Sequence, residues 1–272
     1  RDIFGSRGLG DVYKRQIPAL ESTWEASMDP LLQQRIEGVI HQIQFENVIV
    51  TLEDWKQNGT HNLLEGALIV TRYHYPELDE NSLKANIARL KRDIWLELND
   101  GLTPLEQTKV FNRVVYGLHR FAADDKNPFE PRHCYLNNVL ESKRGNTHSL
   151  GIFYLIISQL LGLPVYGVLL PEYLILVRMD SHITDFSDID EMQKKVVFYI
   201  NPYNNGAVFT RKEIYQYLKT LKKEPEPEYF LPASNESVIR ELVYFMKMVY
   251  RRSGEGDVVA EMSRLLKVFG KQ

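Results

Sequence analysis

The stretch from Tyr135 to Gly206 constrains the fold of this chain more than any other. An apolar run from Ile152 to Leu163 has the length of a buried helix, and Pro164 follows its end. Runs rich in β-branched and aromatic residues come next, which predicts strands over residues 164–170, 173–179 and 196–200. The turn signal Asn-Asn-Gly then precedes a short run over residues 207–209. We therefore predict a core helix followed by paired strands.

Helical patterns flank this stretch on both sides. From Ile17 to about Phe121, apolar residues recur at helical spacing, with a short break after Ile43. Thr103 and Glu106 form a capping-box pattern that predicts a helix continuing to Phe121. Two further helices with facing apolar stripes are predicted in the last forty or so residues. The fold class is α+β, with a helical N-terminal region, a small antiparallel sheet packed on a core helix, and a C-terminal helical hairpin.

The chain divides into segments of different character. Residues 1–16 have no initiator Met and no amphipathic period, and they resemble a translated sequencing adaptor. We expect this leader to be foreign to the native chain, with the true N-terminus, any targeting segment and upstream repeats lost; the alternative is a disordered leader. Residues 17–58 have the size of one HEAT-type helical hairpin, and no second copy follows. Residues 223–234, with alternating Glu and Pro, predict an extended linker before the hairpin of residues 235–272.

Charge and cysteine content exclude several classes of protein. The net charge is −3 and no long run carries one sign, which argues against nucleic acid or an anionic membrane as the main partner. The single cysteine, Cys134, excludes an internal disulfide framework and a multi-cysteine metal site. No apolar run reaches the roughly 18–20 residues that span a bilayer. We expect a cytoplasmic protein.

Three phrases stand out in the patterned stretch. Residues 135–150 contain Y-L-N-N-V-L-E, then come L-G-L-P-V-Y-G-V-L-L-P-E-Y and I-N-P-Y-N-N-G. These phrases resemble the transglutaminase-like family, in particular its SirB1-type bacterial members. The family pattern is roughly Y-L-N-x-V-L-E, then L-G-[IL]-P-V-x-G-V-x-L-P-x-H-F and I-D-P-F-x-x-G. The resemblance implies that residues 59–222 form a transglutaminase-like domain with a papain-like sheet. It also implies that residues 235–272 resemble the tetratricopeptide-like tail of SirB1-type proteins.

The resemblance further implies a catalytic site, and the chain departs from it at each chemical position. The family's chemistry needs a cysteine at a helix start, a histidine on the next strand, and an acid or amide on a third strand. Here Thr147 takes the cysteine's place, or Ser149 in another alignment. Tyr173 takes the place of the histidine and Asn201 that of the acid. The resemblance therefore predicts a degenerate site without the inherited mechanism.

Three other side chains lie close in the sequence to these positions and could replace the missing catalytic groups. His148 lies beside Ser149, but adjacent helical side chains point about 100° apart, so we expect a solvent-facing or capping histidine. Cys134 is expected to be a small buried residue. Glu172 is expected to be an exposed carboxylate at a strand end, with a role as base toward Ser149 as the alternative.

The sequence predicts neither a metal nor a cofactor. An acidic loop could in principle bind Ca²⁺ or Mg²⁺, but it lacks the spacing of a calcium-binding loop and is expected to be a polar excursion between strands; its residues are Asp180, His182, Asp185, Asp188, Asp190 and Glu191. Gly5, Gly8 and Gly10 lie in the leader without a preceding strand, so no phosphate loop is predicted.

The combined prediction is a non-catalytic transglutaminase-like protein that binds a protein or peptide. One alternative is a hydrolase or amidase that depends on Ser149 or Thr147. Another is a structural helical adaptor, in which the C-terminal hairpin captures the partner and the sheet contributes nothing.

Overall fold

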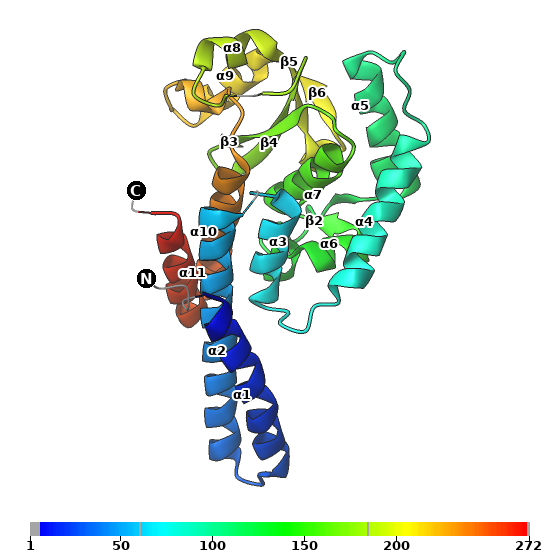
Figure 1. Ribbon diagram of the computed structural model, residues 1–272. Helices are drawn as coiled ribbons and strands as arrows, with labels where there is room; N and C mark the ends of the chain where they lie inside the picture. Colours follow the sequence, from blue (N-terminus) through cyan, green and yellow to red (C-terminus); the bar gives the residue numbers. More distant parts are fainter. Residues whose placement is uncertain (1–5, 60, 184, 271–272) are drawn as a thin grey trace.

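A computed structural model describes residues 6–59, 61–183 and 185–270 of the chain, and the side chains from residue 16 onward. Figure 1 shows a body built around a small sheet and the helix α7 (Thr147–Leu160), with a helical hairpin projecting from one end. The described part contains no helix of the length and apolarity that crossing a membrane requires.

The sheet has four antiparallel strands in the order β3, β4, β5, β6. Strands β3 (Val165–Leu170) and β4 (Tyr173–Met179) pair as a hairpin, with Leu170 opposite Tyr173. Strand β5 (Val196–Asn201) pairs with β4, and β6 (Ala207–Phe209) pairs with β5. The predicted strands are confirmed to within one or two residues.

The two faces of the sheet carry different cores. Leu174, Leu176 and Ile200 belong to the large core cluster that contains α7, and Gly151 of α7 lets Leu174 approach, since a Cβ there would lie 2.8 Å from it. Ile175 and Val177 alternate with them and pack toward α9 (Arg211–Thr220) on the other face. A side chain on β4 therefore faces either α7 or α9, and its position in the strand decides which.

Helices cover the remaining sides of α7. They are α3 (Leu63–Arg72), α4 (Glu80–Trp95), α5 (Pro104–Asn112) and α6 (Leu136–Ser142). The capping box of Thr103 and Glu106 is confirmed at the start of α5. The helix predicted to run to Phe121 changes character at Arg113, where it continues as a π-helix, η1 (Arg113–Leu118).

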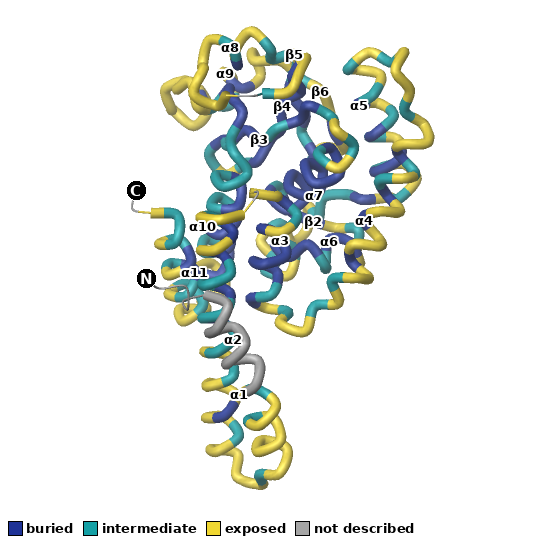
Figure 2. The backbone as a smooth tube through the Cα atoms, viewed as in Figure 1, coloured by how far each residue is buried: buried dark blue, intermediate teal, exposed yellow. Residues whose placement is uncertain are grey.

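The N-terminal hairpin consists of α1 (Ser6–Ala26) and α2 (Pro30–Asn58). The predicted break after Ile43 is wrong: α2 is one continuous helix, because no proline or glycine interrupts residues 39–58. Helix α1 also begins within residues 1–16, which the sequence pattern had not predicted to be helical. Figure 2 shows that the outer end of the hairpin is largely exposed, whereas the part of α2 near the body has one buried face, formed by Phe45, Val48, Leu52 and Trp55.

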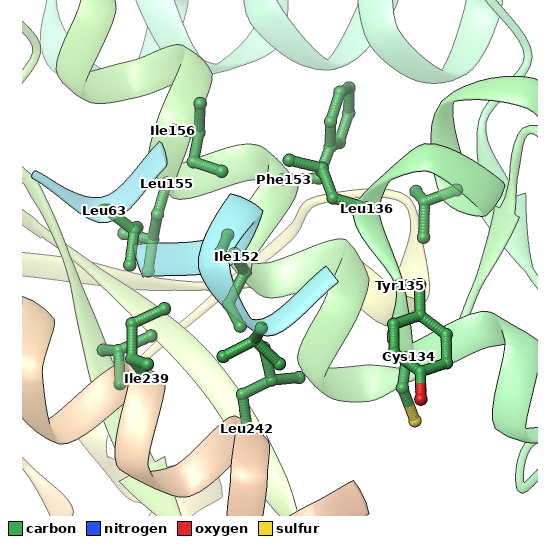
Figure 3. Packing of buried hydrophobic residues seen from close by; sticks show 14 of the residues in the cluster. Leu63, Cys134, Tyr135, Leu136, Ile152, Phe153, Leu155, Ile156, Ile239 and Leu242 are labelled. Atoms are coloured by element: carbon green, nitrogen blue, oxygen red, sulfur yellow. The ribbon is translucent and has the colours of Figure 1, made fainter. Parts of the chain in front are cut away.

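The C-terminal hairpin, α10 (Asn235–Ser253) and α11 (Gly256–Val268), is part of the main core. Figure 3 shows Ile239 and Leu242 of α10 in the same cluster as Leu63 of α3 and Ile152 of α7. The segment before this hairpin was predicted to be an extended linker, but its end packs against the body. Phe230 is 1% exposed, and Ala233 N donates to Gly167 O at 2.7 Å. The end of this segment thus covers the outer edge of β3.

The sequence patterns did not predict several short elements. The polar loop after Phe121 contains β1 (Ala122–Ala123), which pairs in parallel with β2 (Arg144–Gly145) just before α7. A 3-10 turn, η2 (Pro131–Cys134), follows. The acidic excursion between β4 and β5 contains α8 (Ile189–Lys195). Two more 3-10 turns, η3 (Pro202–Asn204) and η4 (Pro227–Tyr229), complete the described elements.

Candidate functional site

The start of α7 is closed by a reciprocal capping arrangement. Asn146 Oδ1 accepts hydrogen bonds from the backbone N–H groups of His148 and Ser149, at 3.0 and 2.9 Å. In return, Ser149 Oγ accepts from the backbone N–H of Asn146 at 3.0 Å. Ser149 is 3% exposed, so its oxygen caps the helix inside the protein. Ser149 and His148 do not pair through their side chains, as the angle between adjacent helical residues predicts.

His148 is fully buried, which contradicts the expectation of a solvent-facing or capping side chain. Its ring stacks on Phe245 of α10 with 4.0 Å between centroids. Nδ1 lies 3.0 Å from Thr147 Oγ1, and Nε2 lies 3.7 Å from Glu241 Oε1. Burial lowers the pKa of His148, and the nearby Glu241 carboxylate offsets part of that effect. The imidazole is therefore neutral at neutral pH. Its Nδ1 contacts the Thr147 hydroxyl, whereas its buried Nε2 has no hydrogen-bond partner among the described residues, because Glu241 lies beyond hydrogen-bond distance.

Thr147 sits at the first position of α7, where the family's cysteine would be. Its hydroxyl contacts the carbonyl oxygen of Glu172 at 3.4 Å, in the turn between β3 and β4. The Glu172 side chain itself is exposed, as expected. Thr147 thus lies near the strand that carries Tyr173, although the two side chains have different surroundings.

Tyr173 faces away from α7. Its ring meets Tyr217 of α9 edge-on, with 5.5 Å between centroids and an interplanar angle of 86°. Asn201 is engaged in the backbone, because its Oδ1 accepts from the N–H groups of Tyr203 and Asn204 at 3.1 and 3.2 Å and so caps η3. The positions of the family's histidine and acid therefore share the α9 face of the sheet, and Thr147 lies with α7 on the opposite face.

A pocket of about 360 Å³ lies on the α9 face, where Tyr173 and Asn201 meet. Most of its walls are apolar or aromatic side chains from the sheet and α9; the lining residues are Leu170, Tyr173, Ile175, Asn201, Asn204, Ala207, Phe209, Glu213, Ile214 and Tyr217. Thr147 and Ser149 are not among them. The cleft retained by this chain therefore lies beside the position of the family's chemistry and does not include its nucleophile.

Carboxylates surround the tyrosines at this end of the sheet. Burial, followed by the charges of Tyr173 and Glu172, raises the pKa of Tyr217 to about 12. Burial and the Asp125 carboxylate raise the pKa of Tyr203 to about 12. These phenols are un-ionised at neutral pH, so they present hydroxyl groups and ring faces.

Cys134 lies close to the start of α7, although it comes from η2. It is 3% exposed, and Asn146 Nδ2 donates to its Sγ at 3.4 Å. Burial raises its pKa to about 12, which keeps the thiol protonated and unreactive at neutral pH. The prediction of a small buried residue is confirmed.

The acidic loop is organised by local contacts. Asp188 caps α8 by accepting from Glu191 N at 2.9 Å, and Asp185 accepts from the backbone and hydroxyl of Ser187. Within the described residues, no three histidine, cysteine or acidic side chains gather as they would around a metal ion. Gly5 lies outside the described residues, and Gly8 and Gly10 fall within α1.

Sequence reasoning missed two groups that contact these residues. Glu241 and Phe245 enclose His148 from α10, and Tyr217 meets Tyr173 from α9. Helical periodicity predicts Phe245 on the apolar face of its helix, but no local signal pairs it with His148. These contacts join segments that are far apart along the chain.

The chain is similar to UPF0162 proteins of several bacteria. One from Xylella fastidiosa strain 9a5c is 24% identical over 237 residues, which cover 83% of this chain and 77% of the relative. One from Vibrio cholerae is 23% identical over 193 residues, covering 70% and 67%. A shorter match, to one from Pasteurella multocida, is 34% identical over 98 residues, covering 36% and 37%. No solved structure matches the chain.

A sequence model of the transglutaminase-like superfamily matches residues 81–243. This range covers more than half of the chain and contains α7, all four strands β3 to β6 and the first half of α10. The protein therefore belongs to the transglutaminase-like superfamily.

Proposed function

We propose that this protein is a SirB1-type, non-catalytic member of the superfamily that binds a peptide or protein segment in the pocket between the sheet and α9. One observation carries the proposal: two positions of the family's chemistry serve as caps of helices, while a pocket remains beside the positions of its histidine and acid. Ser149 caps α7 and Asn201 caps η3. Tyr173 forms part of the pocket wall. The volume falls in the range of sites that take a single side chain or a small ligand.

The surrounding geometry supports an extended partner. Strand β6 is an edge strand of three residues, and Ala207 and Val208 are exposed on it. Extended peptides commonly dock beside such edges and place alternate side chains in neighbouring pockets. The single buried thiol supports a reducing compartment, the cytoplasm, as the place of this binding.

Filling the pocket tests this function. Ala207→Trp would place an indole in the pocket, whereas Val208→Trp would place it on the other face of the same strand. A displayed library of random extended peptides is selected on the wild-type protein, and binding is measured by fluorescence anisotropy. We expect selected peptides to lose at least about tenfold in affinity for Ala207→Trp and to bind Val208→Trp normally, because only the first change occupies the pocket.

Two results would overturn the proposal. The first is that no selected peptide distinguishes Ala207→Trp from Val208→Trp. The second is that the purified wild-type chain hydrolyses or crosslinks peptide amides and that Thr147→Ala or Ser149→Ala stops it. Circular dichroism of each variant shows whether the fold is retained.

A second candidate function is hydrolysis that depends on the Thr147 hydroxyl. The observation that favours it is the alignment of Thr147 Oγ1, His148 and Glu241, with separations of 3.0 and 3.7 Å. In such a reaction, Oγ1 would attack an acyl carbon and pass its proton to His148 Nδ1, and the amine would leave with that proton as the C–N bond breaks. Water would then cleave the acyl-threonine ester, which releases the carboxylic acid and restores the Thr147 hydroxyl. Glu241 would stabilise the imidazolium that forms in between.

A fluorophosphonate probe separates this candidate from the binding function. The hydrolase predicts covalent labelling at Thr147, read as a mass shift, that Thr147→Ala and His148→Asn abolish and Ser149→Ala retains. Unlabelled wild-type protein under conditions that label a known serine hydrolase would count against it.

A further inference from the structure

The pocket beside α9 has an aromatic corner. Tyr173 and Tyr217 stand nearly perpendicular, with 5.5 Å between their centroids, and both line the pocket. Tyr217 is fixed by its hydroxyl, which donates to Pro171 O at 2.6 Å. Its ring therefore stays in place without a ligand. The two aromatic rings at right angles form a wall whose faces carry partial negative charge.

The lining of the pocket carries charge of one sign, although Lys212 lies close enough to Glu213 to help lower its pKa. Of the residues that line the pocket, Glu213 is the one with an ionisable acid or base other than the tyrosines. Its carboxylate accepts hydrogen bonds from the backbone and hydroxyl of Thr210, which lowers its pKa and keeps it ionised. Glu172 precedes Tyr173 in the turn, is exposed, and lies close enough to Tyr217 to influence its pKa.

The floor of the pocket is apolar. Leu170, Ile175 and Ile214 are buried in the core between the sheet and α9. A side chain that enters must therefore offer an aliphatic stem to this floor and a polar or charged end to the rim. Lysine and arginine have this construction, since both bury their methylene groups and keep the charged head at the surface.

We propose that the pocket takes a cationic side chain, lysine or arginine, of an extended peptide; this rests on the binding function proposed above. The methylene stem packs on Ile175 and Ile214. The cation lies against the Tyr173 and Tyr217 rings, within reach of the Glu213 carboxylate. An acidic side chain is repelled by Glu213 and Glu172, and a purely aliphatic one leaves the rim unused. The site lies on the face of the sheet opposite α7, so it does not depend on Thr147.

A defined peptide series tests this selectivity. The probes are fluorescein-labelled acetylated heptapeptides of Ala and Gly with one central Lys, Arg, norleucine, citrulline or Glu. Norleucine keeps the four-carbon stem of lysine without the ammonium group, and citrulline keeps the length of arginine without its charge. We expect Lys and Arg to bind about tenfold more tightly than their neutral counterparts, from the contact of a cation with aromatic rings, and Glu to bind most weakly. The preference should shrink at high salt, because the rim carboxylates are exposed.

Charge-neutral variants identify the residues responsible. Glu213→Gln retains the capping arrangement with Thr210, since glutamine serves at that position, and removes the charge. We expect it to reduce the preference for Lys over norleucine, and Glu172→Gln to add to the reduction. Glu141→Gln, an exposed carboxylate at the end of α6, is the matched control and should leave the preference intact.

The outcomes separate the two proposals. If norleucine and Lys peptides bind equally and both are sensitive to Ala207→Trp, the pocket binds peptides and the cation preference is wrong. If Glu213→Gln leaves the preference for Lys over norleucine unchanged, the proposed cation site is also wrong, and the binding function stands. If no peptide of the series or of the selected library binds, both the binding function and this inference are overturned.

Discussion

Cys134 is the one cysteine of the chain, and burial determines its chemistry. Its Sγ lies near the start of α7, yet the thiol belongs to the core of the domain. A thiolate would have to be formed there without water, so the neutral thiol is strongly favoured. The surroundings of Cys134 therefore remove the reactivity of its thiol.

A pH titration should show this burial. The pKa of Cys134 is about 12 in the folded protein, against about 9 in an unfolded chain. Because the folded value is raised, the stability that Cys134 contributes is complete below pH 9 and is lost as the pH rises toward 12. Urea unfolding of wild type and Cys134→Ala at pH 8 and pH 10 should show a steeper loss for the wild type.

A thiol reagent provides the second readout. We expect Cys134 to react with it only as fast as the protein unfolds, and to react at once in urea. Rapid labelling of the folded protein at pH 8 would contradict the assigned burial.

The sequence predicts which residues occupy the positions of the degenerate site, but it does not predict which face of the sheet their side chains take. Pro171 and Pro202 locate Tyr173 and Asn201 in the sequence pattern, and both fall at the predicted strand ends. The alternation of a strand does not say which helix covers which face. That choice depends on α9, whose Tyr217 meets Tyr173 across a separation of 44 residues in the chain.

At the scale of elements, one glycine turn fixes the end of the sheet against α5. Gly206 has a φ of 71°, and a Cβ there would lie 2.1 Å from Asn112 Oδ1. Asn112 Nδ2 donates to Gly206 O at 2.7 Å and so holds the turn before β6. This turn therefore requires glycine for its conformation and for the close approach of α5.

Two alanine variants separate these requirements. Gly254 also has a positive φ, 82°, but an added Cβ there would meet nothing within 4 Å. Gly254→Ala should lower the free energy of unfolding by about 1 kcal/mol from the left-handed conformation alone. Gly206→Ala should cost clearly more, because Asn112 must also move. Equal losses in urea unfolding would show that Asn112 contributes nothing.

The elements that could be predicted are those whose first and last residues are marked by glycine, proline or a capping pair. Gly162 and Pro164 separate α7 from β3, and Thr103 with Glu106 starts α5. Helix α8 was missed because its seven residues lie within an acidic segment with little apolar periodicity. The π-helix η1 was missed because a side-chain pattern does not distinguish it from an α-helix over one turn.

At the scale of the whole molecule, Glu261 joins three helices. Its carboxylate lies 2.8 Å from His41 Nε2 of α2 and accepts from the Tyr73 hydroxyl, next to the end of α3, at 2.6 Å. Glu261 belongs to α11, so the C-terminal hairpin is tied by polar contacts as well as by its apolar stripe. The sequence predicted the stripe, but these partners are about 190 and 220 residues away and left no local signal.

Removing this carboxylate should loosen α11 without unfolding the body. Glu261→Ala leaves the Tyr73 hydroxyl without its acceptor, and we expect a loss of about 1–2 kcal/mol. Hydrogen exchange should speed up on α11 and the adjoining part of α2 while α7 stays protected. Asp257→Ala, an exposed acid on the same helix, serves as the control. Uniform deprotection of every helix would mean that the hairpin and the body unfold as one unit.

The burial of α10 has a consequence for the order in which this protein can be made. The apolar helix α7 packs against Ile239 and Leu242, and the edge of β3 bonds to Ala233. During synthesis, α7 and the sheet leave the ribosome well before those residues do. The nascent chain must then expose part of its apolar surface until α10 emerges. This interval is therefore the one in which a chaperone would bind the chain.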